Sequence, residues 1–307
     1  MAANPPDVER ALRIARAMFA GDPRVTAIDY GYAYRGGERT KDLVIRIHVT
    51  EKLAREQCKS REFVPARIAG IPTDVLARRY RNSGGGEASG ASAVRPGISV
   101  GNPKARAGTL GLIVFDGTQL AILSCHHVLA GSDGAEGDVI LCPAVERGGT
   151  VADDIVARLH RTYYPSGWGD AAVALIDANR PVRRDCIVSN VTVSAVGEAS
   201  AGLELEKIGA TTVRTRGLVE GTGSYRVEPW GYVVDGFQLG PAPGSPSPGG
   251  NLSLQGDSGA VWYDPVSATG FGMHVASGHE ADGHPYAVAC GLISVIETLQ
   301  VTLEPVR

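Results

Sequence analysis

The sequence has few cysteines, few aromatic residues and no long apolar run. Its five cysteines are an odd number without Cys-x-x-Cys spacing, which argues against a zinc site and against a complete disulfide framework. No apolar stretch approaches the roughly 18 residues that a membrane span requires, so we expect no membrane partner. Aromatic residues make up only 6% of the 307 residues, whereas 40 are glycine. This composition favours short strands and many turns over a helical bundle.

The chain also lacks a strong charge of either sign. Its formal net charge is -3, which gives no electrostatic footprint for nucleic acid. Apolar residues account for 43% and charged residues for 21%, enough to build a buried core. Residues Met1 to Asp7 contain no basic region followed by an apolar block, so we expect no signal peptide and a cytoplasmic protein.

Residues 1–81 are predicted to form a small N-terminal α/β module. Apolar residues at helical spacing predict a helix over 6–19, whose arginine-bearing face either is solvated or docks an acidic partner. Alternating patterns predict a hairpin of 25–34 and 41–50, then a short charged helix and a strand over 68–76. His48 falls on the polar face of the second strand, so we expect it at the surface.

Residues 82–93 are predicted to be a flexible linker, because glycine, serine and alanine dominate them. The remainder, 94–307, shows short apolar strands and frequent turns, including a hairpin of 110–115 and 120–124. Residues 240–250 are predicted to be a surface loop, and 295–299 a short helix or terminal strand.

One turn carries the features of a nucleophile. Gly256-Asp257-Ser258-Gly259 lies between a Gly/Pro/Ser loop and an apolar strand. A serine hydroxyl attacks a carbonyl only when a base removes its proton and donors stabilise the oxyanion. The flanking glycines let the N–H groups of Gly256 and Ser258 converge on one point, as an oxyanion hole requires.

A base and an acid precede this serine. His126 and His127 follow directly after an apolar strand, and Asp170 directly precedes the wholly apolar 171–175. The order His, Asp, Ser is that of chymotrypsin-like enzymes rather than of subtilisins or α/β-hydrolases. The first two residues lie close together in the chain and Ser258 follows much later, which suits two residues in one barrel and the serine in a second.

These motifs resemble those of the trypsin-like peptidase superfamily. His127-Val128 matches the family's histidine block, so the resemblance implies His127 as the general base, with His126 as the alternative. It also implies a mainly β, chymotrypsin-like double barrel over 94–307, Asp170 orienting His127, and no metal or organic cofactor. Segments 96–101, 107–111 and 207–212, together with the N-terminal stretch ending at 68–75, resemble bacterial relatives of the plant Narrow leaf 1 group.

The resemblance implies a serine endopeptidase that acts on protein or peptide substrates through an acyl-enzyme. Leu252 stands where an enzyme specific for basic residues carries an aspartate, so cleavage after Lys or Arg is not expected. Gly272-Met273-His274 resembles the Gly-Ile-His of glutamate-specific endopeptidases, which predicts a pocket wall containing His274, Ala276 and Ser277 and a preference for acidic P1 residues. The alternative for His274 is a core residue without a substrate role.

Two other interpretations stay open. The chain could be a catalytically silent peptidase fold that binds a protein partner, although an intact His127, Asp170 and Ser258 argues against this. The N-terminal module could instead regulate the peptidase, by covering its cleft or by recognising a regulatory protein. Cys125, beside the histidines, is predicted to be a small buried apolar residue rather than a reactive thiol.

Overall fold

The computed structural model describes most of the chain. It covers residues 4–306 except 20, 37, 54–62, 79, 82–92, 165–168, 178–180, 229–230, 244–250 and 280–282. The predicted charged helix after Thr50, nearly all of the linker 82–93 and most of the loop 240–250 therefore lie outside the described residues.

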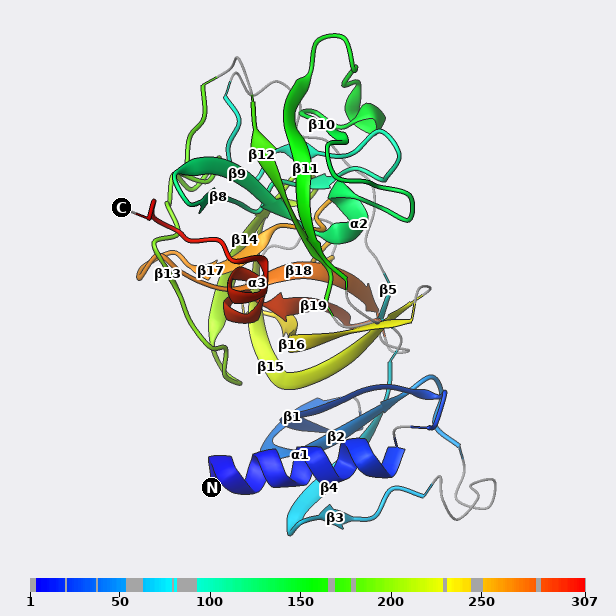
Figure 1. Cartoon of the computed structure of the whole chain (residues 1–307). Coiled ribbons are helices and arrows are strands. Elements are labelled where there is room, and N and C mark those ends of the chain that lie inside the picture. Colours follow the sequence, from blue (N-terminus) through cyan, green and yellow to red (C-terminus); the bar gives the residue numbers. More distant parts are fainter. Residues whose placement is uncertain are drawn as a thin grey trace.

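The N-terminal module is a helix packed on a small sheet (Figure 1). Its elements are α1 (Pro5–Phe19), β1 (Val25–Arg35), β2 (Glu38–Val49), β3 (Arg67–Ile68), β4 (Ile71–Ala77) and β5 (Tyr80–Arg81). Ala11, Ala15 and Phe19 of α1 are buried against Ile45 and Ile47 of β2. The helical and alternating patterns thus meet in one core, as the sequence predicts.

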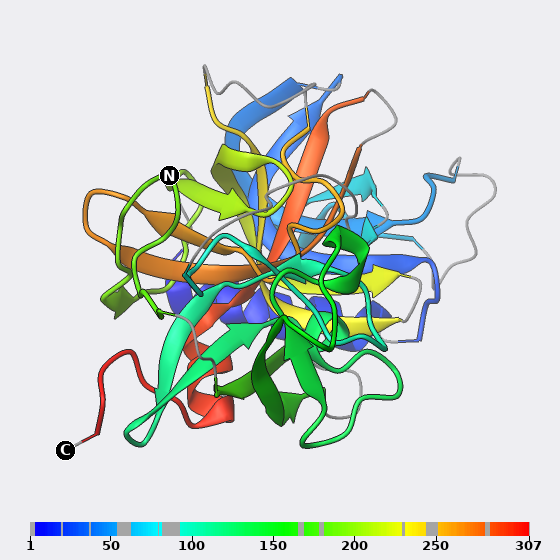
Figure 2. The same ribbon diagram turned by 90° about the horizontal axis from the view of Figure 1, so that it is seen from above.

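The first β-unit follows and carries the two candidate histidines. Its elements are β6 (Ser99–Val100), β7 (Gly108–Thr109), β8 (Leu112–Asp116), β9 (Gln119–Ser124), α2 (His126–Leu129), β10 (Val139–Leu141), the 3-10 helix η3 (Val145–Arg147), β11 (Ile155–Tyr163) and β12 (Ala171–Ile176). Strands β10-β11-β12-β9-β8 form one antiparallel sheet in that order. Figure 2 looks down onto this unit, with the blue N-terminal elements behind it.

The second β-unit carries Ser258. Its elements are β13 (Ala195–Val196), β14 (Glu204–Gly209), β15 (Val213–Glu228), β16 (Tyr232–Pro241), β17 (Val261–Asp264), β18 (Thr269–His279), β19 (Pro285–Gly291) and α3 (Leu292–Leu299). The segment 295–299, predicted to be a short helix or a terminal strand, is part of helix α3. Within the described ranges, no helix combines the length and apolarity that crossing a membrane requires.

The N-terminal sheet is continuous with the second β-unit. Strand β1 pairs antiparallel with β15, from Ala27 opposite Tyr225 to Gly31 opposite Gly221. The path of the large sheet is β14-β17-β18-β19-β16-β15-β1-β2-β4-β3. The division at residue 81 remains a prediction, but main-chain pairing joins the two sides of that boundary.

The seam between β1, β2 and β15 buries a cluster of polar side chains. Asp29 accepts hydrogen bonds from both Arg46, through Nε and Nη2, and the Tyr225 hydroxyl, which lies at 2.6 Å. Arg46 also donates to Gln238 Oε1 at 3.3 Å. Asp29 and Arg46 are both fully buried. A Cβ at Gly221 would lie only 2.1 Å from Arg46 Nη2, so a glycine there makes room for the guanidinium.

The prediction that His48 lies at the surface is wrong. His48 is fully buried, and its Nε2 is 3.2 Å from Asp29 Oδ1. The pattern of β2 correctly separates an apolar face from a polar one, but α1 covers the apolar face and the polar cluster covers the other. Alternation reports the chemistry of each face and not what packs on it.

Burial of His48 predicts a specific pH dependence of stability. Burial lowers the pKa of His48 to about 4, outweighing the attraction of Asp29, and Arg46 and Arg78 lower it further. As pH falls from about 6.5 to about 4, the His48 side chain becomes protonated in the unfolded chain but stays neutral in the folded chain. This group therefore costs on the order of 3 kcal/mol of unfolding free energy across that window.

We expect His48→Gln to reduce the decrease in unfolding free energy as pH falls, because glutamine does not titrate. Urea unfolding of wild type and variant at pH values from 7.5 to about 4 measures it, and the slopes are compared so that any constant destabilisation cancels. Parallel curves across the window would contradict the assignment.

Candidate active site

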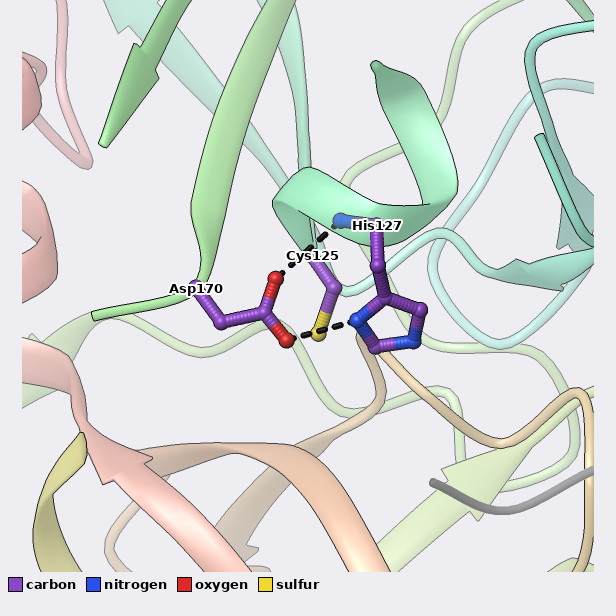
Figure 3. A group of neighbouring side chains, drawn as sticks. All are labelled: Cys125, His127 and Asp170. Atoms are coloured by element: carbon purple, nitrogen blue, oxygen red, sulfur yellow. Dashed lines mark hydrogen bonds and ion pairs between the residues drawn. The ribbon is translucent and has the colours of Figure 1, made fainter. Parts of the chain in front are cut away.

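Asp170 and His127 form a hydrogen-bonded pair. Asp170 directly precedes β12 and is fully buried. Its Oδ2 lies 2.6 Å from His127 Nδ1, and its Oδ1 accepts the backbone N–H of His127 at 3.1 Å. Figure 3 shows the imidazole with Nδ1 turned toward the carboxylate. The two contacts fix both the position and the orientation of the ring relative to the acid.

His126, the alternative base, points elsewhere. Its ring stacks on Tyr164 with centroids 4.5 Å apart and an angle of 15° between the planes. Burial lowers the pKa of His126. Of the two neighbouring histidines, His127 is the one in contact with Asp170.

The backbone around Ser258 lies against the segment that carries His127. Thr109 on β7 donates its N–H to Ser258 O at 2.8 Å. The His274 carbonyl accepts both Gly259 N–H, at 2.9 Å, and Cys125 Sγ, at 3.3 Å. Residues adjacent to Ser258 and to His127 thus meet at one oxygen, so the fold brings the three predicted residues into one region.

The Ser258 hydroxyl is buried and makes no hydrogen bond to the described residues. Within the described part of the chain Oγ makes no hydrogen bond, to His127 or to any other residue, and Ser258 is only 1% exposed. Contacts between a nucleophile and its base are often long without substrate and tighten when substrate binds.

The turn before Ser258 has a conformation that favours glycine. Gly256 has φ +95°, and a Cβ there would lie 2.6 Å from Thr211 Oγ1 and 2.8 Å from Arg147 Nη2. The Gly256 carbonyl accepts the Thr109 hydroxyl at 2.6 Å. The two N–H groups predicted to form the oxyanion hole flank Asp257, so the anchoring of that residue decides where they point.

Asp257 is anchored by a fully buried ion pair. Its Oδ2 lies 2.9 Å from Lys207 Nζ, and neither side chain is exposed. Further donors complete the shell of the carboxylate, namely the Thr212 hydroxyl at 2.6 Å, the Ser253 hydroxyl at 3.1 Å and the N–H groups of Thr211, Thr212 and Leu254 at 3.0 to 3.1 Å.

The electrostatics of this pair are dominated by burial and mutual attraction. Burial alone would raise the pKa of Asp257, but the Lys207 ammonium and the Thr212 hydroxyl hold it well below its usual range. Burial lowers the pKa of Lys207, and Asp257 offsets part of that effect. An ionised carboxylate in a dry interior is tolerable only with such a complete set of partners.

Cys125, His127 and Asp170 place one sulfur, nitrogen and oxygen ligand atom each within 4.8 Å of one another (Figure 3). A metal would need the thiolate, yet burial, together with the Asp170 charge, raises the pKa of the Cys125 thiol well above its usual value. His127 Nδ1 is also already bonded to Asp170. The chemistry of this group fits a hydrogen-bonded pair beside a neutral thiol, and the prediction that Cys125 is a buried small residue is confirmed.

The four predicted specificity residues have different environments. His274 is fully buried, its Nε2 lies 2.7 Å from Ser253 Oγ, and burial lowers its pKa to about 3. Leu252 is buried in an apolar cluster with Trp262. Ala276 is buried, whereas Ser277 is partly exposed. His274 is therefore a neutral side chain in this structure.

Comparisons with known proteins place the fold. No family model and no curated protein matches the sequence. Among solved structures, Thermobifida fusca protease A matches with 16% identity and a TM-score of 0.50, over 68% of this chain and 97% of its own. A glutamic acid-specific serine protease described as using a histidine triad in substrate binding matches with 15% identity and a TM-score of 0.52, over 69% and 100%. A Nocardiopsis protease matches with 14% identity and a TM-score of 0.50, over 68% and 98%.

At these identities the similarity establishes the fold and nothing finer. The chain has a mainly β, chymotrypsin-like fold, preceded by a helix and additional strands. The prediction of fold class is confirmed, and the two β-units correspond to the two barrels of that fold.

Sequence reasoning missed the residues that hold the turn carrying Ser258. Lys207 and Thr109 lie in segments singled out only for their resemblance to other proteins. Lys207 comes 50 positions before its partner Asp257, and a lone lysine in a strand carries no local signal of an ion pair. The only hint that the sequence offers is that Lys207 falls on the same strand face as the apolar Leu203 and Leu205.

We expect Lys207→Met to destabilise the protein by about 3–5 kcal/mol, because it leaves the buried Asp257 carboxylate without its counterion. Lys104→Met is the matched control: Lys104 Nζ also lies 2.9 Å from a carboxylate, that of Asp138, but its side chain is 51% exposed. The control should lose no more than about 1 kcal/mol. Urea unfolding at neutral pH measures both, and equal losses would contradict the assignment.

Proposed function

We propose that this protein is a serine endopeptidase with Ser258 as nucleophile, His127 as general base and Asp170 as the acid that orients it. The observation that carries the proposal is the 2.6 Å contact between Asp170 Oδ2 and His127 Nδ1. This contact orients the imidazole and provides a negative charge to stabilise the imidazolium that forms during proton transfer. The same carboxylate accepts the backbone N–H of His127 at 3.1 Å, so it holds the main chain and the ring together.

The proposed reaction is acyl transfer. Ser258 Oγ attacks the scissile carbonyl while His127 takes its proton, and the tetrahedral oxyanion forms beside the N–H groups of Gly256 and Ser258. His127 then gives the proton to the leaving amine, which leaves an acyl-enzyme that water hydrolyses by the same steps. The Lys207–Asp257 pair supports this role, because it holds the turn that carries both N–H groups.

The chymotrypsin-like fold supports the proposal at the level of reaction class, since its solved neighbours are proteases. We also infer kinship with bacterial relatives of the plant Narrow leaf 1 group, on the motifs of the sequence alone. The substrates would be proteins or peptides. The proposed chemistry requires no cofactor.

A silent peptidase fold that binds a partner is the competing function. One observation favours it: Ser258 Oγ is buried and makes no hydrogen bond among the described residues. Chemical labelling of the serine separates the two functions, because only an activated hydroxyl reacts with a fluorophosphonate.

We expect a fluorophosphonate to label wild type on Ser258 and the protein to hydrolyse a small activated ester. Ser258→Ala should abolish both activities, and His127→Ala should lower ester hydrolysis by a factor of about 10³ or more. His126→Ala is the matched control and should stay within about three-fold of wild type, since it leaves the proposed base intact. Unlabelled wild type, or a larger loss in the His126 variant than in the His127 variant, would refute the assignment.

Specificity for acidic P1 residues extends the proposal. It rests on the resemblance of Gly272-Met273-His274 to glutamate-specific enzymes and on the apolar Leu252. Because His274 is neutral and bonded to Ser253, it would offer a substrate carboxylate a hydrogen bond rather than a charge. Ser253 would have to turn away for Nε2 to be reached.

We expect a peptide library to be cleaved after Glu or Asp in preference to Lys or Arg, because no carboxylate stands at position 252 to bind a cation. Mass spectrometry of the products, with Ser258→Ala as the blank, measures the preference. Cleavage mainly after Lys or Arg would contradict it.

A further inference from the structure

Only one edge of β18 faces the candidate nucleophile. At His274 this edge is occupied by the nucleophile turn: His274 O accepts Gly259 N–H at 2.9 Å, and His274 N–H donates to Ala260 O at 2.8 Å. The opposite edge is taken by β19 as far as His279. An extended peptide whose carbonyl sits at Ser258 can therefore add to β18 only along the first edge, beyond His274.

Strand β5 already lies on that edge. Arg81 pairs antiparallel with Ser277, and Ser277 pairs with Ala287 of β19 on its other side. Since a strand has two edges, Arg81 must occupy the one that continues from the nucleophile turn. Figure 1 draws β5 beside the end of β18. The protein's own main chain thus fills the position that a substrate strand would take.

Contacts with β15 and with the neighbouring Arg78 hold β5 in position. Tyr80 and Arg81 pair in parallel with Val227 and Glu228 of β15. Just before them, Arg78 is buried and donates its N–H to Val49 O at 2.9 Å.

The Arg78 side chain ties this point to the second β-unit. Its guanidinium donates to Gln238 of β16 and lies 3.8 Å from Glu220 of β15. Contacts with both the N-terminal module and the β15–β16 hairpin therefore position β5 at the edge of β18.

The rest of the site is closed in the same structure. Ser258 is 1% exposed and the His127 side chain 10%. Both side chains are therefore largely buried in the structure in which β5 occupies the edge of β18.

We propose that β5 is a built-in competitor of the substrate, so that an extended peptide binds only when β5 leaves the edge of β18. This inference rests on the proposed peptidase function and specifies its regulation. Small reagents that do not use the edge react with Ser258 whether β5 is bound or not. The apparent affinity for long peptides falls by the fraction of molecules with the edge open.

The first experiment weakens β5. Tyr80→Gly/Arg81→Gly reduces the propensity of these residues for a strand, and it should raise kcat/KM for a fluorogenic eight-residue peptide about ten-fold. Fluorophosphonate labelling and ester hydrolysis should change less than about two-fold. Lys41→Gly/Asp42→Gly, two adjacent exposed residues of β2, is the matched control and should behave as wild type in all three assays.

The second experiment locks β5 in place with Arg81→Cys/Ser277→Cys. Directly opposed residues of antiparallel strands have Cα atoms about 4.5–5.5 Å apart, within the reach of a disulfide. The oxidised variant should hydrolyse the long peptide at least about ten-fold more slowly than the same variant after reduction, with unchanged labelling of Ser258. Arg81→Cys alone controls for the oxidant, and Cys125, Cys142, Cys186 and Cys290 are buried.

The outcomes separate the regulation from the activity. Labelling of Ser258 with no change in long-peptide hydrolysis in either experiment would overturn the inference and leave the peptidase function standing. No labelling in wild type or any variant would overturn the proposed function and the inference with it. A gain in the glycine variant, or a loss in the oxidised variant that reduction reverses, supports the inference.

Discussion

The pairing of β15 is the constraint on which the rest of the structure depends. A strand in a protein interior must pair its N–H and C=O groups along both edges. Strand β16 takes one edge of β15, and β14, β1 and β5 divide the other between them. The N-terminal strands thereby become part of the sheet that carries the candidate nucleophile. The same strand also pairs with β5, which brings β5 to the end of β18. The pairing of β15 therefore positions both the N-terminal module and the segment beside the candidate site.

Two buried carboxylates have parallel structural roles. Asp257 fixes the turn that carries Ser258 through Lys207, and Asp29 fixes the seam with β15 through Arg46 and Tyr225. Burying an ionised group is costly unless every lone pair finds a donor. Each site therefore tolerates only the arrangement in which segments distant in the chain meet. The polar clusters contribute to the specificity of the fold, and apolar packing supplies most of its stability.

Local signals predicted much of the fold and the composition of the candidate site. Helical spacing located α1, alternation located β1 and β2, and two apolar runs joined by a turn located β8 and β9, because each pattern reflects local geometry. The same alternation misled at His48, since it cannot tell what covers the polar face of a strand. The sequence contained Lys207 and Thr109 but no indication of their roles, which depend on partners far away in the chain.

The sequence by itself determined the chemistry available: a serine in a glycine turn, a histidine after one apolar strand and an aspartate before another, in chymotrypsin-like order. These are short-range properties, because each depends on a residue and its immediate neighbours. Only the tertiary structure decided that His127 rather than His126 contacts Asp170, that Lys207 neutralises Asp257 and that β5 lies on the edge of β18. Such pairings follow from how strands align across the sheet, which no local pattern encodes.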